Sequence, residues 1–115
     1  MIYTGKSLSV SLLEDGFAEL VFDAQGSVNK FDRQTVSELD EATQALLAKG
    51  DVKGLVVRSA KPAFIVGADI TEFTGLFAMD DAEVLQWVAN TSQVFDRFED
   101  LPFPTIAAVN GFALG

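Results

Sequence analysis

Two residue types that carry much of enzyme chemistry are missing from this sequence: its 115 residues contain no cysteine and no histidine. Their absence excludes disulfides, thiol nucleophiles, histidine general bases and Cys/His zinc sites within the chain. Metal ligands would have to be carboxylates alone, and the acidic cluster at residues 80–83 is better explained as a helix N-terminus, where negative charge is favourable. We therefore expect no metal site.

Basic residues are also scarce, because 8 Lys and Arg stand against 17 Asp and Glu, for a net charge of −9. This balance argues against a nucleic-acid-binding protein and against an anionic membrane surface as partner. The sequence has no apolar run long enough to span a bilayer and no signal-peptide pattern at its N-terminus. We expect a cytoplasmic protein that can still bind a single anionic ligand.

The apolar content is high, at 49% with ten phenylalanines, and is sufficient for a hydrophobic core. Alternation of polar and apolar residues predicts two strands joined by a hairpin turn at 14–16. Asp32 is a suitable N-cap for a helix that ends near Lys49, with Gly50 as its stop. The full expected order is strands 7–13 and 17–22, helix 32–49, strand 53–58, helix 81–98 and strand 105–109.

Two of the predicted strands, 53–58 and 105–109, are almost wholly apolar, which is typical of strands buried in a parallel sheet. Asp69 and Glu72 have the spacing of a capping box, so a short helix is expected to open near Ile70. This order of elements predicts an α/β fold. Because residues 105–115 form an apolar strand and turn without a closing helix, we expect the chain to be a truncated piece of a larger domain.

Backbone groups are the strongest candidates for chemistry in this sequence. Gly67 precedes a predicted helix start, where unpaired N–H groups can bind an oxyanion. A single glycine at such a place is more often a plain turn. A second glycine-bearing turn, from Gly111 to Gly115, also follows an apolar strand, so the two turns could each direct one N–H group at the same oxygen.

Two segments, 63–70 and 104–115, resemble the signature segments of the crotonase, or enoyl-CoA hydratase/isomerase, superfamily. The resemblance covers essentially the whole chain. It implies the N-terminal portion of a crotonase-type ββα spiral fold, with residues 1–115 as an incomplete enoyl-CoA hydratase/isomerase domain. Segments 23–31, 65–73 and 98–102 are further similar to the α subunit of bacterial fatty acid oxidation complexes, which joins this domain to a 3-hydroxyacyl-CoA dehydrogenase domain.

The resemblance implies specific roles for residues near the two turns. The backbone N–H of Ala68 is expected to donate to the thioester oxygen, with Gly67 allowing the close approach. The second donor is expected directly after Gly115, in the turn that Gly111 begins. The two glutamates that hydratases use as acid and base are expected beyond Gly115. Asp69 is better explained as a helix cap than as their replacement.

Contacts to coenzyme A are expected from a turn and from the main chain of the first signature segment. The residues concerned are Ser27, Val28, Val66, Asp69 and Ile70. Arg58 and Lys61 are the nearest bases in sequence, and they are either phosphate contacts or a solvated pair at a loop. Trp87, Phe73 and Phe77 are candidates for the acyl pocket, although plain core is the commoner role of such residues.

The reaction implied is hydration of a trans-2-enoyl-CoA to a 3-hydroxyacyl-CoA in fatty acid β-oxidation. It needs no cofactor beyond the coenzyme A thioester, which is the substrate, whereas NAD is expected only if the parent carries the dehydrogenase domain. The resemblance also implies a homo-oligomer and pairing of the parent with a 3-ketoacyl-CoA thiolase β subunit. Isomerase, thioesterase and dehalogenase activities stay open for the parent, and the isolated chain is alternatively a non-catalytic, self-associating fragment.

Overall fold

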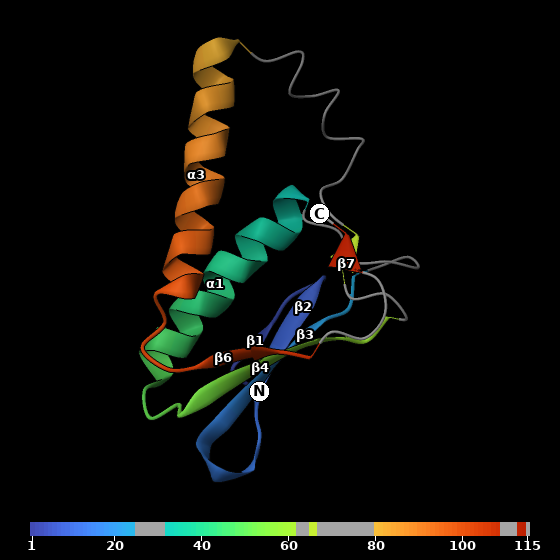
Figure 1. Ribbon diagram of the computed structural model, residues 1–115, viewed down its shortest axis with the longest axis vertical. Coiled ribbons are helices and arrows are strands. Elements are labelled where there is room, and N and C mark those ends of the chain that lie inside the picture. Colours follow the sequence, from blue (N-terminus) through green and yellow to red (C-terminus); the bar gives the residue numbers. More distant parts are fainter. Residues whose placement is uncertain (25–31, 62–64, 67–79, 109–112, 115) are drawn as a thin grey trace.

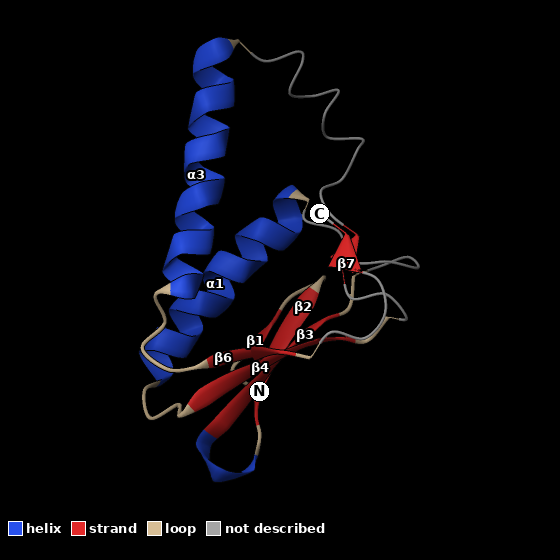
Figure 2. Cartoon of the chain, in the orientation of Figure 1, coloured by secondary structure: helices blue, strands red, loops and turns tan. Residues whose placement is uncertain are grey.

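The computed structural model describes residues 1–24, 32–61, 65–66, 80–108 and 113–114 (Figure 1). Two long helices separate three groups of strands along the described part of the chain (Figure 2). In order, the elements are β1 (Tyr3–Thr4), β2 (Leu8–Leu12), a 3-10 turn (Glu14–Gly16), β3 (Phe17–Phe22), α1 (Arg33–Lys49), β4 (Gly54–Ser59), β5 (Ile65–Val66), α3 (Asp81–Glu99), β6 (Thr105–Ala107) and β7 (Ala113–Leu114). This order confirms the predicted succession of strands and helices.

The main sheet has five strands in the order β1-β2-β3-β4-β6, antiparallel from β1 to β3 and parallel from β3 to β6. Its register explains the core, because Val10 pairs with Leu20 and Leu20 pairs with Val57. All three side chains are at most 6% exposed and therefore share the buried face of the sheet. The alternating pattern of β2 and β3 thus defines one apolar face.

The turn between β2 and β3 takes the left-handed backbone conformation that tight hairpins need. Asp15 has φ 63° and Gly16 has φ 85°. Glycine reaches this region without steric cost, and aspartate tolerates it better than most residues. The predicted hairpin turn at 14–16 is confirmed.

Helix α1 covers the buried face of the sheet and begins and ends where the sequence predicts. The carboxylate of Asp32 accepts a hydrogen bond from the Thr35 N–H at 2.7 Å, and Gly50 ends the helix with φ 67°. Leu39, Ala42 and Leu46 are almost completely buried. They form the helix side of a core shared with the strands (Figure 1).

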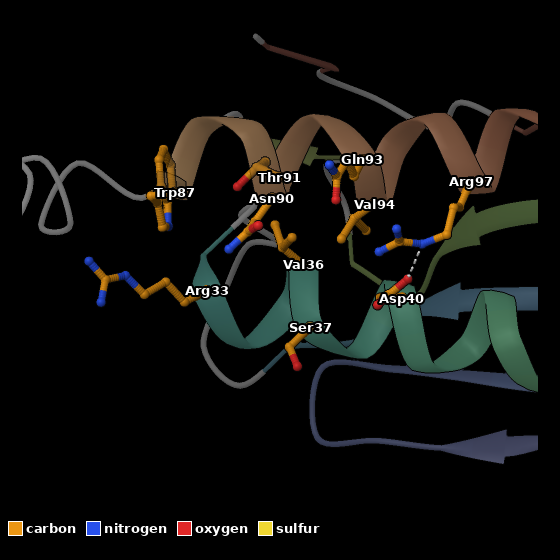
Figure 3. A pocket seen from close by; sticks show the side chains of 10 residues that line it. All are labelled: Arg33, Val36, Ser37, Asp40, Trp87, Asn90, Thr91, Gln93, Val94 and Arg97. Atoms are coloured by element: carbon orange, nitrogen blue, oxygen red, sulfur yellow. Dashed lines mark hydrogen bonds and ion pairs between the residues drawn. The ribbon is translucent and has the colours of Figure 1, made fainter. Parts of the chain in front are cut away.

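Helix α3 packs against α1 mainly through its C-terminal half. Asp80 caps it by accepting from the Glu83 N–H at 2.8 Å, and Arg97 Nε donates to Asp40 Oδ1 of α1 at 2.9 Å (Figure 3). Val94 is the one buried side chain of the helix, whereas Leu85 is 70% exposed. Neither α1 nor α3, the helices of the described part of the chain, has an apolar stretch that could cross a membrane.

Two burial predictions are wrong. Strand β4 lies between parallel neighbours as expected, but Val56 is only half-buried and Arg58 is exposed, so one face of the sheet is open. Strand β6, predicted to be buried, has all three residues exposed, with Ile106 at 62%. The reason is its position, because β6 is the edge strand of the five-stranded sheet and, among the described strands, pairs with β4 alone.

Candidate functional site

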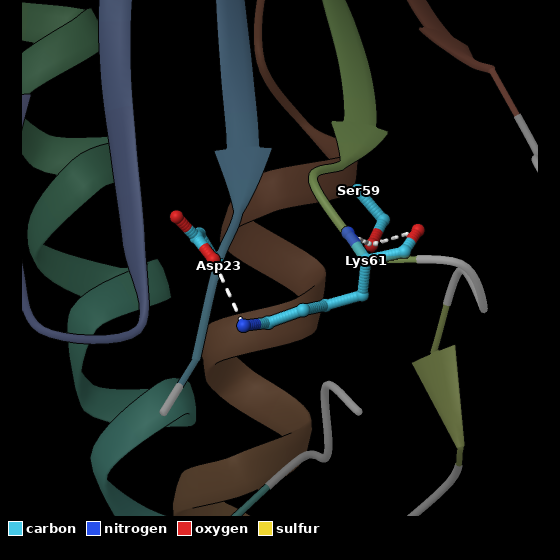
Figure 4. Close-up of polar contacts among 3 residues, drawn as sticks. All are labelled: Asp23, Ser59 and Lys61. Carbon is cyan, nitrogen blue, oxygen red and sulfur yellow. Dashed lines mark hydrogen bonds and ion pairs between the residues drawn. The ribbon is translucent and has the colours of Figure 1, made fainter. Parts of the chain in front are cut away.

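The carboxyl ends of β3 and β4 meet at one edge of the sheet, where open α/β sheets usually place their ligands. Lys61 Nζ lies 3.1 Å from Asp23 Oδ1, an ion pair that joins the residues following the two strands (Figure 4). The Lys61 N–H also donates to Ser59 Oγ at 2.9 Å. These contacts hold together the residues that directly follow β3 and β4.

The ion pair between Lys61 and Asp23 bears on the phosphate contacts proposed for Arg58 and Lys61. Lys61 is mostly buried beside Asp23, and Arg58 Nε lies 3.0 Å from Glu19 Oε2. Each base therefore has a carboxylate partner on or next to β3. Arg58 is exposed on β4, whereas Lys61 is mostly buried, and a contact of either base with phosphate stays a prediction.

A second, two-stranded sheet brings the two signature segments together. Strands β5 and β7 are parallel, with Ile65 opposite Ala113 and Val66 opposite Leu114. The chain positions that directly follow the two strands are Gly67 and Gly115. Because paired parallel strands lie about 4.8 Å apart and run in the same direction, β5 and β7 end side by side at Val66 and Leu114.

Of the predicted site residues, Val66 is described, as the last residue of β5. The others lie outside the described residues, and their proposed roles stay predictions. They are the coenzyme A turn Ser27 and Val28, the oxyanion residues Gly67 and Ala68, the following Asp69 and Ile70, and the second turn's Gly111 and Gly115. The capping box at Asp69 and Glu72 lies outside the described residues as well.

A polar cavity of about 470 Å³ lies between the turn after β1 and the N-terminus of α1. It is lined by Lys6, Ser7, Ala24, Asp32 and Gln34, so the residues on both sides of segment 25–31 reach it. Sequence reasoning missed Lys6 and Ser7, because no local pattern places the turn after β1 beside the N-terminus of α1.

Glu38 holds that turn in place. Its Oε1 accepts hydrogen bonds from the Ser7 N–H at 2.9 Å, the Ser7 Oγ at 3.1 Å and the Leu8 N–H at 3.3 Å. Burial raises the pKa of Glu38, but the hydrogen bonds from Ser7, Gln34 and the Lys6 backbone lower it more, so the pKa lies below its ordinary value. The carboxylate therefore stays charged and rigidly bound beside the cavity.

The model of the enoyl-CoA hydratase/isomerase family matches residues 13–115 of the chain. The chain belongs to the enoyl-CoA hydratase/isomerase family. The paired β5 and β7 strands are thus elements of a crotonase fold, as the sequence resemblance predicted.

Solved structures give the same result. An enoyl-CoA hydratase from Shewanella pealeana superposes with a TM-score of 0.83 at 25% identity, over 91% of this chain and 39% of its own. An enoyl-CoA hydratase/isomerase from Xanthobacter autotrophicus gives 0.79 at 27% identity, over 94% and 40%. An enoyl-CoA hydratase from Bacillus anthracis, at 24% identity and a TM-score of 0.79 over 95% and 42%, supports the fold alone.

The chain spans about two-fifths of the length of these structures. The β1–β3 meander, the α1 crossover and the parallel β3-β4-β6 strands therefore match the corresponding part of a crotonase fold. This match assigns the chain to the family as a whole. The more specific resemblance to the fatty acid oxidation complex α subunit stays a prediction.

Proposed function

We propose that this chain supplies the first oxyanion donor of an enoyl-CoA hydratase of fatty acid β-oxidation. The observation that carries the proposal is the parallel pairing of β5 with β7. It brings the segment before Gly67 and Ala68 next to the segment before Gly115. Two N–H donors that follow these strands would converge on one thioester oxygen as it gains enolate charge.

In this proposal the thioester oxygen accepts from the Ala68 N–H and from a second backbone N–H that follows Gly115 in a longer chain. Two glutamates of that longer chain orient the water and transfer protons during its addition across the α,β double bond. We place a coenzyme A contact at Ser27 and Val28 on sequence resemblance. The cavity lined by Lys6, Ala24 and Asp32 supports it, because Ala24 and Asp32 flank this segment in the chain and Lys6 offers a cation.

We extend the proposal to the parent protein on sequence resemblance to the fatty acid oxidation complex α subunit. That parent would be cytoplasmic and homo-oligomeric, would carry an NAD-dependent 3-hydroxyacyl-CoA dehydrogenase domain and would pair with a thiolase β subunit. Isomerase activity would use the same oxyanion donors, whereas thioesterase and dehalogenase activities need differently placed carboxylates. Sequencing the source gene beyond Gly115 tests the hydratase assignment, which requires a Gly-Gly-x-x-Glu continuation. The same sequence tests whether a dehydrogenase domain follows.

The donor is tested in the longer protein by Ala68→Pro, which removes the N–H. Loss of one such donor costs about 3–4 kcal/mol, so kcat with crotonyl-CoA should fall by roughly 10²–10³. Ala68→Gly is the matched control, because it changes the same side chain and keeps the donor. Unchanged kcat in a folded Ala68→Pro variant refutes the assignment.

The 115-residue chain itself gives a second test. We expect no hydration of crotonyl-CoA above background, because the proposed acid and base lie outside it. Measurable turnover by the purified chain would show that the catalytic carboxylates are among its own residues and would overturn this division of roles.

A further inference from the structure

Strand β6 forms an open edge of the five-stranded sheet. Thr105, Ile106 and Ala107 are all exposed, and Ile106 is 62% exposed. Ala108, directly after the strand, is exposed as well. Among the described strands, β6 pairs with β4 alone. The outer side of β6 is therefore accessible to a further strand.

The hydrogen bonds to β4 show which main-chain groups of β6 point outward. Pro104 O accepts from an N–H of β4, and the Ala108 N–H donates to a carbonyl of β4, each at 2.8 Å. The main-chain groups of successive residues alternate between the two sides of a strand, so residue 106 also faces β4. The N–H and C=O groups of Thr105 and Ala107 consequently point away from the sheet.

This edge lacks the usual protection against pairing. Natural sheets protect an exposed edge with charged side chains or with proline at an outward position. Residues 105–108 carry no charge, and Pro104 lies on the side that faces β4. The opposite edge, β1, is only two residues long and is soon followed by the charged Lys6. Of the two edges, β6 is thus the one suited to strand pairing.

A second copy of the chain fits this edge in a symmetric register. Two identical strands related by a two-fold axis beside each other pair antiparallel. If the axis passes through Ile106, Thr105 stands opposite Ala107 of the second copy, and the two residues exchange hydrogen bonds through their outward groups. Ile106 then stands opposite its own counterpart at a non-hydrogen-bonded position, where side chains come closest. One register therefore pairs the outward groups and covers the exposed isoleucine.

Charge favours this part of the surface for contact between copies. The chain carries −9, so two copies repel each other over much of their surface. On the open face of the sheet, Arg58 Nε lies 3.0 Å from Glu19 Oε2, so these two charges compensate each other. Ile106 shares that face, because its partner on β4 is Val56, two residues before Arg58. The second copy thus meets an uncharged strand beside a compensated ion pair.

We propose that two copies of this chain associate through β6, antiparallel and centred on Ile106, and so join their sheets into one continuous sheet. Contact through one short strand buries less than the roughly 1,200 Å² of total surface that is usual for stable complexes, so the dimer should be weak. Because a two-fold contact closes on itself, association should stop at two copies. This contact is independent of the proposed thioester chemistry.

Sedimentation equilibrium of the purified chain over a range of protein concentrations tests the association. The apparent mass should rise from that of one copy towards that of two. Added salt should strengthen association, because it screens the repulsion between two chains of charge −9. A single-copy mass at every concentration leaves the edge to some other strand and overturns the proposal. Growth beyond two copies, or association that weakens with salt, also overturns it.

Amide hydrogen exchange, followed by NMR at low and high protein concentration, tests the register. The outward N–H groups of Thr105 and Ala107 should exchange more slowly as the dimer fraction rises. The Ile106 N–H, which faces β4, should change less. Exchange that is independent of concentration at Thr105 and Ala107, or protection confined to Ile106, overturns the proposal.

Proline substitutions separate the outer from the inner side of β6. Ala107→Pro removes an outward N–H and keeps the bonds to β4, so it should abolish the dimer in a folded chain. Ala108→Pro is the matched control, because it removes the N–H that donates to Val57 O. It should therefore lower Tm more than Ala107→Pro does. A folded Ala107→Pro variant that dimerises like wild type refutes the contact.

A side-chain variant tests the centre of the contact without proline. Ile106→Lys places two like charges opposite each other and should weaken association by about fivefold or more. Leu47→Lys, at a leucine of α1 that is 48% exposed, is the matched control with the same change of charge. It should leave the dimer fraction unchanged. If both variants reduce the dimer fraction equally, association is non-specific and the proposal fails.

Discussion

The contact between Glu38 and the turn after β1 makes a sharp prediction about stability. The carboxylate is 5% exposed and accepts hydrogen bonds from Ser7 and Leu8, two of them from backbone N–H groups. Glu38→Ala leaves these donors buried without a partner. Glu38→Gln retains an acceptor oxygen but removes the charge that strengthens each bond.

The magnitude follows from the number of bonds. Each orphaned buried N–H costs about 1–3 kcal/mol, so Glu38→Ala should lower the free energy of unfolding by about 4 kcal/mol. Glu38→Gln should cost about 2 kcal/mol, because charge-assisted bonds weaken to neutral ones. At about 4 °C per kcal/mol for a domain of this size, Tm should fall by about 16 °C and about 8 °C.

The assay is urea denaturation followed by far-ultraviolet circular dichroism, repeated over a range of pH. Since the folded pKa of Glu38 is depressed, its contribution is present above the ordinary pKa of 4.5 and is lost as pH falls through the folded pKa. Wild type should therefore lose stability in acid more steeply than Glu38→Gln. The two curves should approach each other at the lowest pH.

Controls separate this contact from general effects of charge. Glu99→Gln, at an exposed position, should change stability by less than about 0.5 kcal/mol. Gly5→Ala should resemble Glu38→Ala, because a Cβ at Gly5 would collide with Glu38 Oε1. The combined variant should cost less than the sum of the two single changes. A Glu38→Ala loss below about 1 kcal/mol, or full additivity with Gly5→Ala, refutes the reasoning.

Three further outcomes are expected. Burial, together with Glu41 and Glu38, raises the pKa of Tyr3 to about 12, so absorbance titration of this sole tyrosine should show a high midpoint that Glu41→Gln lowers. The free energy of unfolding should fall as pH rises from 10 towards 12. An ordinary midpoint in the folded chain contradicts the contact between Tyr3 and Glu41. Asp80→Ala should cost about 1 kcal/mol by removing the α3 cap, as thermal unfolding measures, whereas Asp80→Asn should cost little. If exposed Ile106 drives self-association of the isolated chain, Ile106→Lys should reduce the sedimentation-equilibrium mass, and an unchanged mass argues against β6 as the contact.

Local signals predicted most of the secondary structure. The N-cap at Asp32, the stop at Gly50 and the hairpin turn at Gly16 depend on neighbouring residues and backbone dihedral angles, and the structure confirms all three. Burial was harder to predict, because it depends on which element packs over a strand. An apolar sequence predicted a buried 105–109 strand, but the sheet order places β6 at an edge with Ile106 exposed.

The candidate site was also predicted only in part from the sequence. Glycine next to apolar strand ends suggested two backbone turns, and the chain's lack of histidine and cysteine removed side-chain alternatives. The sequence could not show that β5 and β7 pair, since 46 residues lie between Val66 and Ala113 in the chain and only the strand register joins them. Nor could the sequence show that Glu38 accepts a hydrogen bond from Ser7, or that Trp87 and Arg33 line one groove between α1 and α3.

By itself, the sequence determined the type and limits of the main elements, the anionic character of the chain and the family to which it belongs. These properties follow from residue spacing, capping and composition, which act over a few positions. Tertiary structure alone decided that β5 and β7 lie side by side, that β6 is exposed and that α1 and α3 enclose a groove. Such features arise from contacts between distant residues, and these contacts are fixed only when the whole core packs.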